Sequence, residues 1–300
     1  MNILLLGKNG QIGYELCRTL LPLGQLTTLG RDEIDFLNLD NLQRVLYAHA
    51  PDVIVNAVAY TAVDLAEKHS DLAFTINSEA VKLIARYTME TQAILIHYST
   101  DYVFDGEKSE AYLETDLPHP QNSYGASKLA GEKAIKQSGC AHLIFRTSWV
   151  FSKKNNNFVH TILKLAKEKE TLSIVDDQYG APTSAEFIAD VTALAIISYY
   201  QKKLPIGTYH LTASGATNWH SYAQYIVKIA LKQNATFKLT PHKIMPISSE
   251  VYQASAKRPK NSRLNHQLLA EKLGIIFPDW KIHVDLLISH IFTHTELTQS

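Results

Sequence analysis

The chain has 300 residues, 46% of them apolar and 19% charged, so it is long enough to bury a sizeable core in one large domain or two smaller ones. Its 29 basic and 29 acidic residues cancel, and no basic patch or arm indicates a nucleic-acid partner. No apolar run is long enough to span a bilayer, and the N-terminus enters an apolar strand without a basic leader, so we expect a cytoplasmic protein with no membrane partner.

The first predicted strand, Asn2–Leu6, runs into a glycine-rich turn and a helix from about Gln11 to Leu21. Strand, glycine turn and helix in this order are typical of a dinucleotide-binding site, because the free N–H groups of the helix attract a pyrophosphate. The spacing is Gly-x-x-Gly-x-x-Gly, a variant of the usual fingerprint, and an ordinary βα turn is the alternative. The glycines expected to form this site are Gly7, Gly10 and Gly13.

The second predicted strand, Gln25–Leu29, ends in Gly30-Arg31-Asp32. An acid at this point binds an adenosine ribose, whereas an arginine accepts a 2′-phosphate. Arg31 therefore favours NADP, and Asp32 beside it leaves NAD open. Asp35 and Phe36 are expected to border the adenine.

Three more strands are predicted, at 52–57, 93–98 and 142–146, with helices at about 39–49 and 71–88 and a further helix after residue 122. Alternation of strands and helices predicts a Rossmann-type, doubly wound parallel sheet. Ligands bind outside the carboxyl ends of such strands, where residues 56–61 and 99–104 follow two of them. Cys17 and Cys140 are expected to be buried free thiols rather than a disulfide.

Tyr124 and Lys128 are four residues apart on the helix that Asn122 or Ser123 can cap and Gly139 can end. Both side chains therefore point to one side. An ammonium about 4 Å from the phenol would lower the tyrosine pKa by as much as ~3 units, towards neutral pH. The pair would then exchange protons with a substrate. The alternative is a chance spacing, with Lys128 paired to Glu132.

Beyond Phe151 the alternation changes, and helices are expected near 155–168, 185–200, 219–232, 265–273 and 282–292. The helix after Ala185 and a strand at 208–212 are expected to return to the sheet. We therefore predict a cofactor domain of residues 1–151 and 184–213, and a smaller α/β substrate-binding domain of residues 152–183 and 214–300.

Several stretches together resemble one family across nearly the whole chain. The glycine turn, Ser99-Thr100-Asp101-Tyr102-Val103-Phe104 and Tyr124-x-x-x-Lys128 resemble the extended short-chain dehydrogenases. Further stretches narrow the resemblance to the reductases of dTDP-linked 4-keto sugars: Tyr60-Thr61-Ala62-Val63-Asp64, Phe145-Arg146-Thr147-Ser148-Trp149-Val150, Asp177-Gln178-Tyr179-Gly180-Ala181-Pro182-Thr183 and Arg258-Pro259-Lys260-Asn261-Ser262-Arg263-Leu264.

The resemblance implies that NADPH or NADH reduces the C4 keto group of a dTDP-linked sugar. It implies that Tyr124 donates the proton and that Lys128 lowers the tyrosine pKa and holds the nicotinamide ribose. Thr100 would bind the reacting oxygen, Asp101 would contact the sugar and Trp149 would lie against it. Gly10, Gln11 and Ile12 would meet the pyrophosphate of the cofactor. The residues implied to line the cofactor cleft are Asp35, Phe36, Ala59, Tyr60 and Thr61.

Two arginines in the polar segment after residue 257, Arg258 and Arg263, are candidates to clamp the substrate diphosphate. Surface ion pairing is the alternative. Two other functions on the same fold stay open: a nucleotide-sugar epimerase or dehydratase, and a non-catalytic NADP-binding regulatory subunit. A dehydratase of this superfamily usually carries Glu after the Thr-Asp pair, where this chain has Tyr102.

A structural metal is the last expectation. Glu186 and Asp190 are four residues apart on one helix, and Glu15 lies early in the first helix. Exposed acids without a metal are the alternative. The resemblance implies that such carboxylates, contributed by two subunits, bind Mg²⁺ at the interface of a homodimer.

Overall fold

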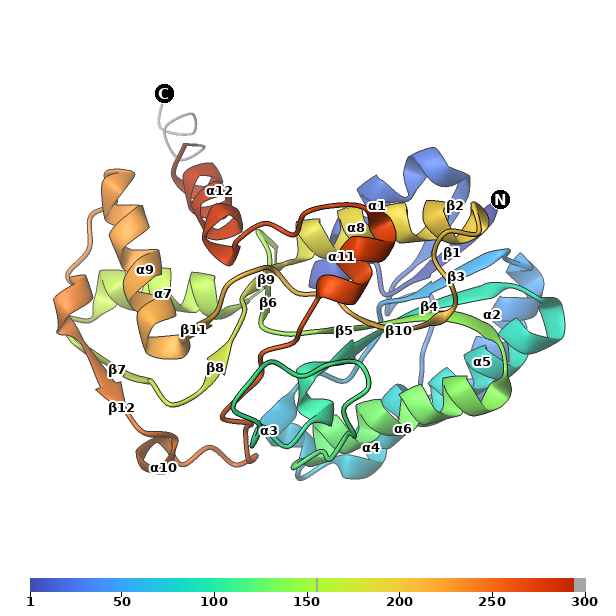
Figure 1. The fold of residues 1–300 in the computed structure, drawn as a ribbon, viewed down its shortest axis with the longest axis horizontal. Helices are drawn as coiled ribbons and strands as arrows, with labels where there is room; N and C mark the ends of the chain where they lie inside the picture. The colour runs from blue at the N-terminus through green and yellow to red at the C-terminus, as the bar shows by residue number, and fades with distance from the viewer. Residues whose placement is uncertain (155, 294–300) are drawn as a thin grey trace.

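The computed structural model describes residues 1–154 and 156–293. In Figure 1 a large lobe built on a central sheet fills the right and centre, and a smaller lobe lies at the left. The predicted fold class, a Rossmann-type doubly wound parallel sheet with a smaller α/β part, is confirmed.

The central sheet has the strand order β10-β5-β4-β3-β1-β2, and every neighbouring pair is parallel. Its order reverses between β1 and β3, the switch point at which doubly wound sheets bind ligands. The strands are β1 (Asn2–Leu6), β2 (Gln25–Leu29), β3 (Val53–Asn56), β4 (Ile94–Thr100), β5 (Ala141–Thr147) and β10 (Gly207–His210).

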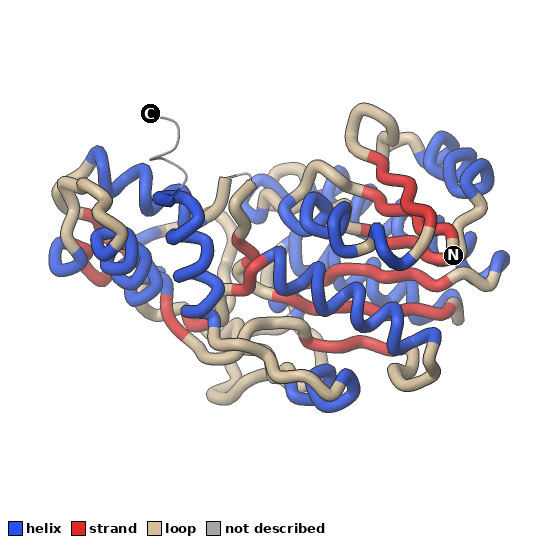
Figure 2. The backbone as a smooth tube through the Cα atoms, turned by 90° about the horizontal axis from the view of Figure 1, so that it is seen from above, coloured by secondary structure: helices blue, strands red, loops and turns tan. Residues whose placement is uncertain are grey.

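Helices cover both faces of this sheet, as Figures 1 and 2 show. One face carries α1 (Gln11–Thr19), α8 (Ala185–Tyr200) and α11 (Gln267–Leu273). The other carries α2 (Leu39–His49), α5 (Ala80–Thr91) and α6 (Ser123–Ser138), with α3 (Val63–Ala66) and α4 (Ser70–Phe74) beside α6. Single-turn elements are η1 (Leu21–Leu23), η3 (Asp101–Val103), η4 (Pro241–Lys243) and a π-helical turn, η2 (Thr75–Glu79).

Local sequence explains the two elements that position the site. β1 is a continuous apolar run buried on both faces, as a central parallel strand requires. The Oδ1 atom of Asn122 accepts the N–H of Gly125 at 2.8 Å and so caps α6, while Gly139 ends the helix with a φ of +72°. Asn122, rather than Ser123, is therefore the cap.

The smaller lobe has its own apolar core, in which Phe151, Tyr222 and Trp280 are buried. Its helices are α7 (Phe158–Glu168), α9 (Trp219–Lys232), α10 (Ser249–Tyr252) and α12 (Trp280–Thr293). Its short strands pair as β7 (Leu172–Val175) with β12 (Ile244–Ile247) and β8 (Tyr179–Gly180) with β11 (Thr217–Asn218), while β6 (Val150–Phe151) pairs with β9 (Thr183–Ser184).

The predicted return of α8 and β10 to the large lobe is confirmed, because β10 pairs with β5 at the sheet edge. One further segment returns: Leu269 of α11 and Phe277 after it are buried in the core of the large lobe. The exact division of the chain into two domains stays a prediction, supported by the two separate cores.

Cys17 and Cys140 are free thiols, as expected, with Cys140 buried and Cys17 half-buried. Within residues 1–154 and 156–293, no helix is both long and apolar enough to cross a membrane.

Candidate active site

The glycine turn forms a close-packed cradle between β1 and α1. Gly7 has a φ of +94°, which favours glycine, and its N–H donates to the carbonyl of Leu29 at 2.8 Å. A Cβ on Gly13 would lie 2.0 Å from the Gly7 oxygen, so that position also requires glycine. Gly10 begins α1 without a side-chain cap, and the first turn holds no acid. The start of α1 therefore fits an anionic pyrophosphate.

The side chain of Gln11 connects the glycine turn to the segment at Val150–Ser152. Its Nε2 donates to the Val150 carbonyl at 3.4 Å, and its Oε1 accepts the Ser152 hydroxyl at 3.0 Å. The Gln11 side chain is thus held towards β6, and Ile12 is half-buried behind it against the core of the large lobe.

The rim at the end of β2 carries a charge pair that sequence reasoning missed. Lys8, inside the glycine turn, lies 2.6 Å from Glu33, and Glu33 accepts the N–H of Gly30 at 2.7 Å. The Lys8 hydrogen bond lowers the pKa of Glu33. Arg31 is exposed beside them. The signal was available, because a lysine between two fingerprint glycines must lie near the bound cofactor.

Asp35 is exposed close to this rim, where its Oδ1 atom accepts the N–H of Leu37 at 2.9 Å. The side chain of Phe36 does not lie where the sequence placed it, at the edge of the adenine site. It is 5% exposed and packs in the core with Leu42 and Leu46, so it is a core side chain and not a wall of an open cleft.

The loop after β3, with Ala59, Tyr60 and Thr61, lies at the carboxyl edge as expected, half-buried to exposed. A residue missed from the sequence holds it. The Asn77 amide accepts the N–H of Tyr60 at 2.9 Å and donates to its carbonyl at 3.1 Å. Asn77 lies in η2, and π-helical turns are frequent at functional sites.

Thr100, Asp101 and Tyr124 are brought together where β4 ends. The Thr100 hydroxyl donates to Asp101 at 2.9 Å and accepts the N–H of Tyr102 at 3.1 Å. The Thr100 hydroxyl also lies close enough to the phenol of Tyr124 to affect the pKa of that phenol. Burial raises the pKa of Asp101 to about 6, and its Oδ2 atom is buried without a hydrogen-bond partner among the residues that the structure describes.

The expected lowering of the Tyr124 pKa is wrong for the cofactor-free protein. Burial raises the pKa of Tyr124 to about 12, and the charge of Asp101 adds to the rise, against a smaller opposing effect of the Thr100 hydrogen bond. Lys128 is fully buried one turn away, and its Nζ lies 3.3 Å from Nε2 of His97 rather than beside the phenol. Burial lowers the pKa of Lys128 itself to about 8, with Glu132 opposing.

Lys128 and Glu132 do not form the simple pair that was the alternative. Glu132 binds Arg146 through two hydrogen bonds of 2.8 and 2.7 Å, and both side chains are fully buried. These bonds and the charge of Arg146 hold the pKa of Glu132 below its usual value despite burial.

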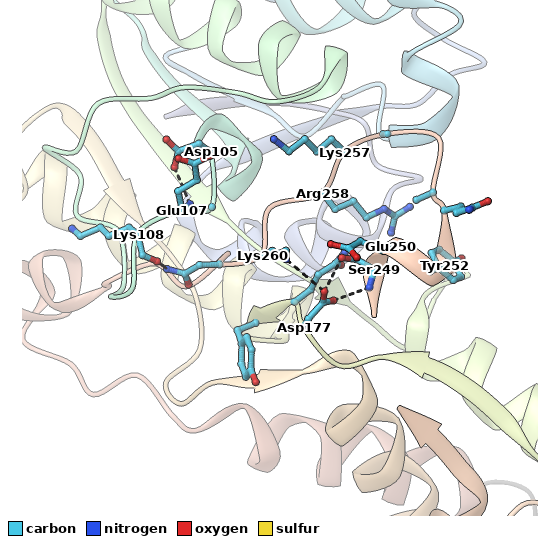
Figure 3. Close-up of a pocket in the computed structure, with 17 residues that line it drawn as sticks. Asp105, Glu107, Lys108, Asp177, Ser249, Glu250, Tyr252, Lys257, Arg258 and Lys260 are labelled. Carbon is cyan, nitrogen blue, oxygen red and sulfur yellow. Dashed lines mark hydrogen bonds and ion pairs between the residues drawn. The ribbon is translucent and has the colours of Figure 1, made fainter. Parts of the chain in front are cut away.

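A cavity of 810 Å³ lies between the loop after β4 and the smaller lobe (Figure 3). Three cations of one segment line it: Lys257, Arg258 and Lys260. Arg258 donates to Asp64 at 2.7 Å, and its Nε is buried without a partner in the described part of the chain. Lys108 and four acids, Asp105, Glu107, Asp177 and Glu250, also line the cavity, so the positive charge that an anionic ligand could meet is local to the 257–260 segment.

Arg263 does not share this cavity with Arg258. Its Nε donates to Asn261 at 2.8 Å and its Nη2 to the Ser109 carbonyl, and it lines a separate cavity of 240 Å³. The expected clamp of two arginines is therefore not assembled, because Arg263 is committed to the backbone of the loop that it braces.

Trp149 adopts a φ of +48°, which is uncommon for a non-glycine residue, and stacks on Trp219 with ring centroids 3.6 Å apart. A Cβ on Gly180 would lie 2.6 Å from its ring, so the glycine makes room for the indole. Trp149 is half-buried between them, and its predicted contact with a sugar stays a prediction.

The three predicted metal ligands lie near one another across α1 and α8. Burial raises the pKa of Glu15, and the charges of Glu186 and Asp190 add to the rise. Asp190, however, pairs with Arg18 at 3.0 Å. Among the residues that the structure describes, no group of three or more His, Cys, Asp or Glu side chains can hold a metal ion. The side chains of one copy therefore do not fit Mg²⁺.

Comparisons with known proteins agree with this geometry. The family model described as RmlD substrate binding domain matches residues 1–292. A curated dTDP-4-dehydrorhamnose reductase of Salmonella typhimurium is 46% identical over 301 residues, covering 99% of this chain and 100% of the relative.

Two solved structures are similar. One, dTDP-4-dehydrorhamnose reductase of Bacillus anthracis in complex with NADP, is 34% identical with a TM-score of 0.84, covering 95% of this chain and 97% of that one. The other, an orthologue of the same reductase from Clostridium acetobutylicum, is 33% identical with a TM-score of 0.88, covering 97% and 99%.

A doubly wound sheet with a glycine cradle after β1, Thr100 at the end of β4 and Tyr124-x-x-x-Lys128 on α6 defines an extended short-chain dehydrogenase. Within that class, the family model and the curated relatives are specific. The chain belongs to the dTDP-4-dehydrorhamnose reductase family.

Proposed function

We propose that the protein reduces the C4 keto group of dTDP-4-dehydro-L-rhamnose to give dTDP-L-rhamnose, with NADPH or NADH as the hydride donor. The observation that carries this proposal is the closeness of Thr100, at the end of β4, to the phenol of Tyr124 on α6. A ketone placed there would accept the O–H of Tyr124, and also that of Thr100 once it turns away from Asp101.

The residues of the chain have separate tasks in this reaction. Negative charge develops on the ketone oxygen, and the preorganised hydroxyls of Thr100 and Tyr124 stabilise it. Tyr124, with a pKa of about 12, stays protonated at neutral pH and gives its proton to that oxygen. The nicotinamide cofactor supplies the hydride when it is bound. Lys128 holds the cofactor ribose and returns a proton to the phenolate.

The 810 Å³ cavity has the volume of a typical small-molecule site and carries Lys257, Arg258 and Lys260. We assign the substrate diphosphate to these cations, with Arg258 as its main contact because its planar guanidinium binds two phosphate oxygens at once. Asp101 and Trp149 would contact the sugar.

The cofactor would lie along Gly7–Gly13 and the Ala59–Thr61 loop, with its adenosine at Arg31 and Asp35. Lys8 and Arg31 favour the 2′-phosphate of NADPH, whereas Glu33 and Asp32 favour the free ribose of NADH. We infer that both cofactors are used.

One assay tests the proposal: oxidation of NADPH or NADH by the purified protein with dTDP-4-dehydro-L-rhamnose, against UDP-linked 4-keto sugars. Stoichiometric oxidation with the dTDP sugar is expected, and its loss in Tyr124→Phe. Conversion of the sugar without net oxidation would indicate an epimerase. Cofactor binding with no turnover of any sugar would indicate the regulatory subunit instead.

A magnesium-bridged homodimer and a cytoplasmic location belong to the same proposal. The Mg²⁺ ligands would have to come from Glu15, Glu186 and Asp190 of two copies, because residues 1–154 and 156–293 of one copy supply no complete set. Sedimentation velocity with Mg²⁺ and after EDTA tests this. A dimer that persists in EDTA and in Glu186→Gln would contradict the metal site. A monomer under all conditions would contradict the homodimer.

A further inference from the structure

A line of three buried polar side chains lies behind the proposed site. Asn56 ends β3, His97 is on β4 and Lys128 is on α6, and they are 1%, 0% and 2% exposed. Nδ2 of Asn56 lies 3.2 Å from Nδ1 of His97, and Nε2 of His97 lies 3.3 Å from Nζ of Lys128. The proposed reaction, as assigned above, gives His97 no role.

The backbone fixes the orientation of the Asn56 amide. The N–H of Val58 donates to Oδ1 of Asn56 at 3.1 Å, so the carbonyl oxygen of that amide faces Val58 and the NH₂ group faces His97. Rotating the amide by half a turn would set two N–H donors against each other at Val58. An amide NH₂ only donates, and Nδ1 of His97 must therefore accept.

A neutral imidazole carries one N–H and one acceptor nitrogen. Burial, with the charge of Lys128 adding to it, holds the pKa of His97 well below its usual range, so the ring is neutral. With Nδ1 accepting from Asn56, the proton of the ring is on Nε2. That N–H points at Nζ of Lys128. An amine accepts this hydrogen bond and an ammonium cannot, so the contact disfavours the ammonium, in the same direction as the lowered pKa of Lys128.

The charges around Lys128 agree with this arrangement. Its neighbour Glu132 is already bound twice by Arg146 and once by Lys136, at 3.5 Å. A permanent ammonium at Lys128 would leave this buried group with excess positive charge, which burial penalises.

We propose that His97, held in its Nε2–H tautomer by Asn56, is a positioning residue that donates a hydrogen bond to Lys128 and so favours the neutral amine. Lys128 thereby becomes a better proton donor. When its ammonium gives a proton to the Tyr124 phenolate, the N–H bond of Lys128 breaks, the O–H bond of Tyr124 forms, and the amine left behind is the form that His97 stabilises. This role rests on the proposed function, whereas the tautomer does not.

The tautomer is measured directly in the cofactor-free protein. Nitrogen-15-labelled histidine and long-range proton–nitrogen NMR show which ring nitrogen is protonated, and the His97 signals are identified by their loss in His97→Gln. We expect protonated Nε2 and bare Nδ1. A protonated Nδ1, or an imidazolium at neutral pH, would overturn the proposal whatever the protein catalyses.

The variant Asn56→Asp should reverse the tautomer of His97. A carboxylate at residue 56 accepts instead of donating, so the His97 proton should move to Nδ1, and Nε2 should then accept from a Lys128 ammonium. The basic limb of the kcat profile with pH should move up by about one unit or more. His142→Gln is the control, because His142 is a buried histidine on β5 bound to the Cys140 carbonyl at 2.8 Å. This variant should change neither the His97 tautomer nor the pH profile of kcat.

Each result decides one claim. If the wild-type tautomer is as expected but Asn56→Asp leaves the pH profile unmoved, His97 has only a structural role and the proposal is wrong. If the wild-type protein oxidises no NADPH with the dTDP sugar, the proposed function fails while the tautomer measurement still stands. A variant that does not fold leaves the wild-type spectrum as the deciding measurement.

Discussion

Asn77 is hydrogen-bonded through one side-chain amide to both backbone polar groups of Tyr60, accepting from the N–H at 2.9 Å and donating to the carbonyl at 3.1 Å. The same Nδ2 lies 2.9 Å from the Ser127 hydroxyl on α6. Asn77 is fully buried, and a Cβ on Gly131 would lie 2.2 Å from its carbonyl oxygen. The loop at the cofactor cleft is thus fixed to the helix that carries Tyr124 and Lys128.

We expect Asn77→Ala to weaken NADPH binding by about tenfold, because an unclamped Tyr60 loop must be ordered when the cofactor binds. Stability should fall by about 1–3 kcal/mol through unpaired buried groups. Ser127→Ala keeps the clamp and is the control. Isothermal titration with NADPH measures both variants, and equal losses in the two would contradict the clamp.

Tyr124→Phe should leave NADPH affinity unchanged and reduce kcat by about 10²-fold or more, the usual scale of general acid catalysis. Tyr98→Phe is matched to it, since that phenol is also buried on the β4 side and bonds Thr192 at 2.8 Å, away from the site. Single-turnover measurement of NADPH oxidation compares them. Near wild-type turnover in Tyr124→Phe would remove the proton donor from the mechanism.

Arg31→Ala and Glu33→Gln should change cofactor choice in opposite directions. Loss of the guanidinium weakens NADPH more than NADH, because only NADPH presents a 2′-phosphate. Loss of the Glu33 charge frees Lys8, 2.6 Å away, and removes a repulsion, so NADPH should gain on NADH. The ratio of the two dissociation constants is the readout. The same shift in both variants would show that the rim does not read the phosphate.

Arg258→Ala should raise the KM for the nucleotide sugar and leave kcat less affected, because the diphosphate is remote from the reacting carbon. Arg263→Ala is the natural comparison, since its side chain lines the separate 240 Å³ cavity. Initial rates over a range of sugar concentrations give both constants. A larger KM effect in Arg263→Ala would move the phosphate contact to that cavity.

Asp101 should make stability depend on pH. Its folded pKa, about 6, lies above its ordinary value of 3.8, so its contribution is present below about pH 4 and is lost as the pH rises through 6. The loss is about 3 kcal/mol. Urea unfolding of wild type and Asp101→Asn across this window measures it. A constant difference between the two proteins would show that the carboxyl titrates normally.

Sequence patterns identified the elements that carry the chemistry because local rules govern them. The apolar run of β1, the glycines after it and the capped helix of Tyr124 each follow from neighbouring residues. The same reasoning failed for properties that depend on burial, such as the pKa of Tyr124. Spacing placed Tyr124 and Lys128 one turn apart on α6, but it did not show that Nζ of Lys128 turns to His97 or that burial raises the tyrosine pKa to about 12.

The missed residues share one cause. His97 lies inside an apolar strand and Asn77 inside a long helical segment, where each looks like an ordinary core or surface residue. Their partners are 31 and 17 residues away in the chain, so only the fold joins them. Arg263 was assigned wrongly for the same reason, because its contact with Ser109 spans 154 residues.

The position of β10 beside β5 has a consequence for synthesis. Residues 2–147 contain all the strands of the central sheet except β10. They leave the ribosome some sixty residues before Gly207–His210. During that interval β5 is an unprotected sheet edge, able to pair with another nascent chain. We infer that aggregation of truncated or slowly translated chains begins at β5. The α8–β10 segment, which is synthesised later, pairs with β5 and so prevents this aggregation.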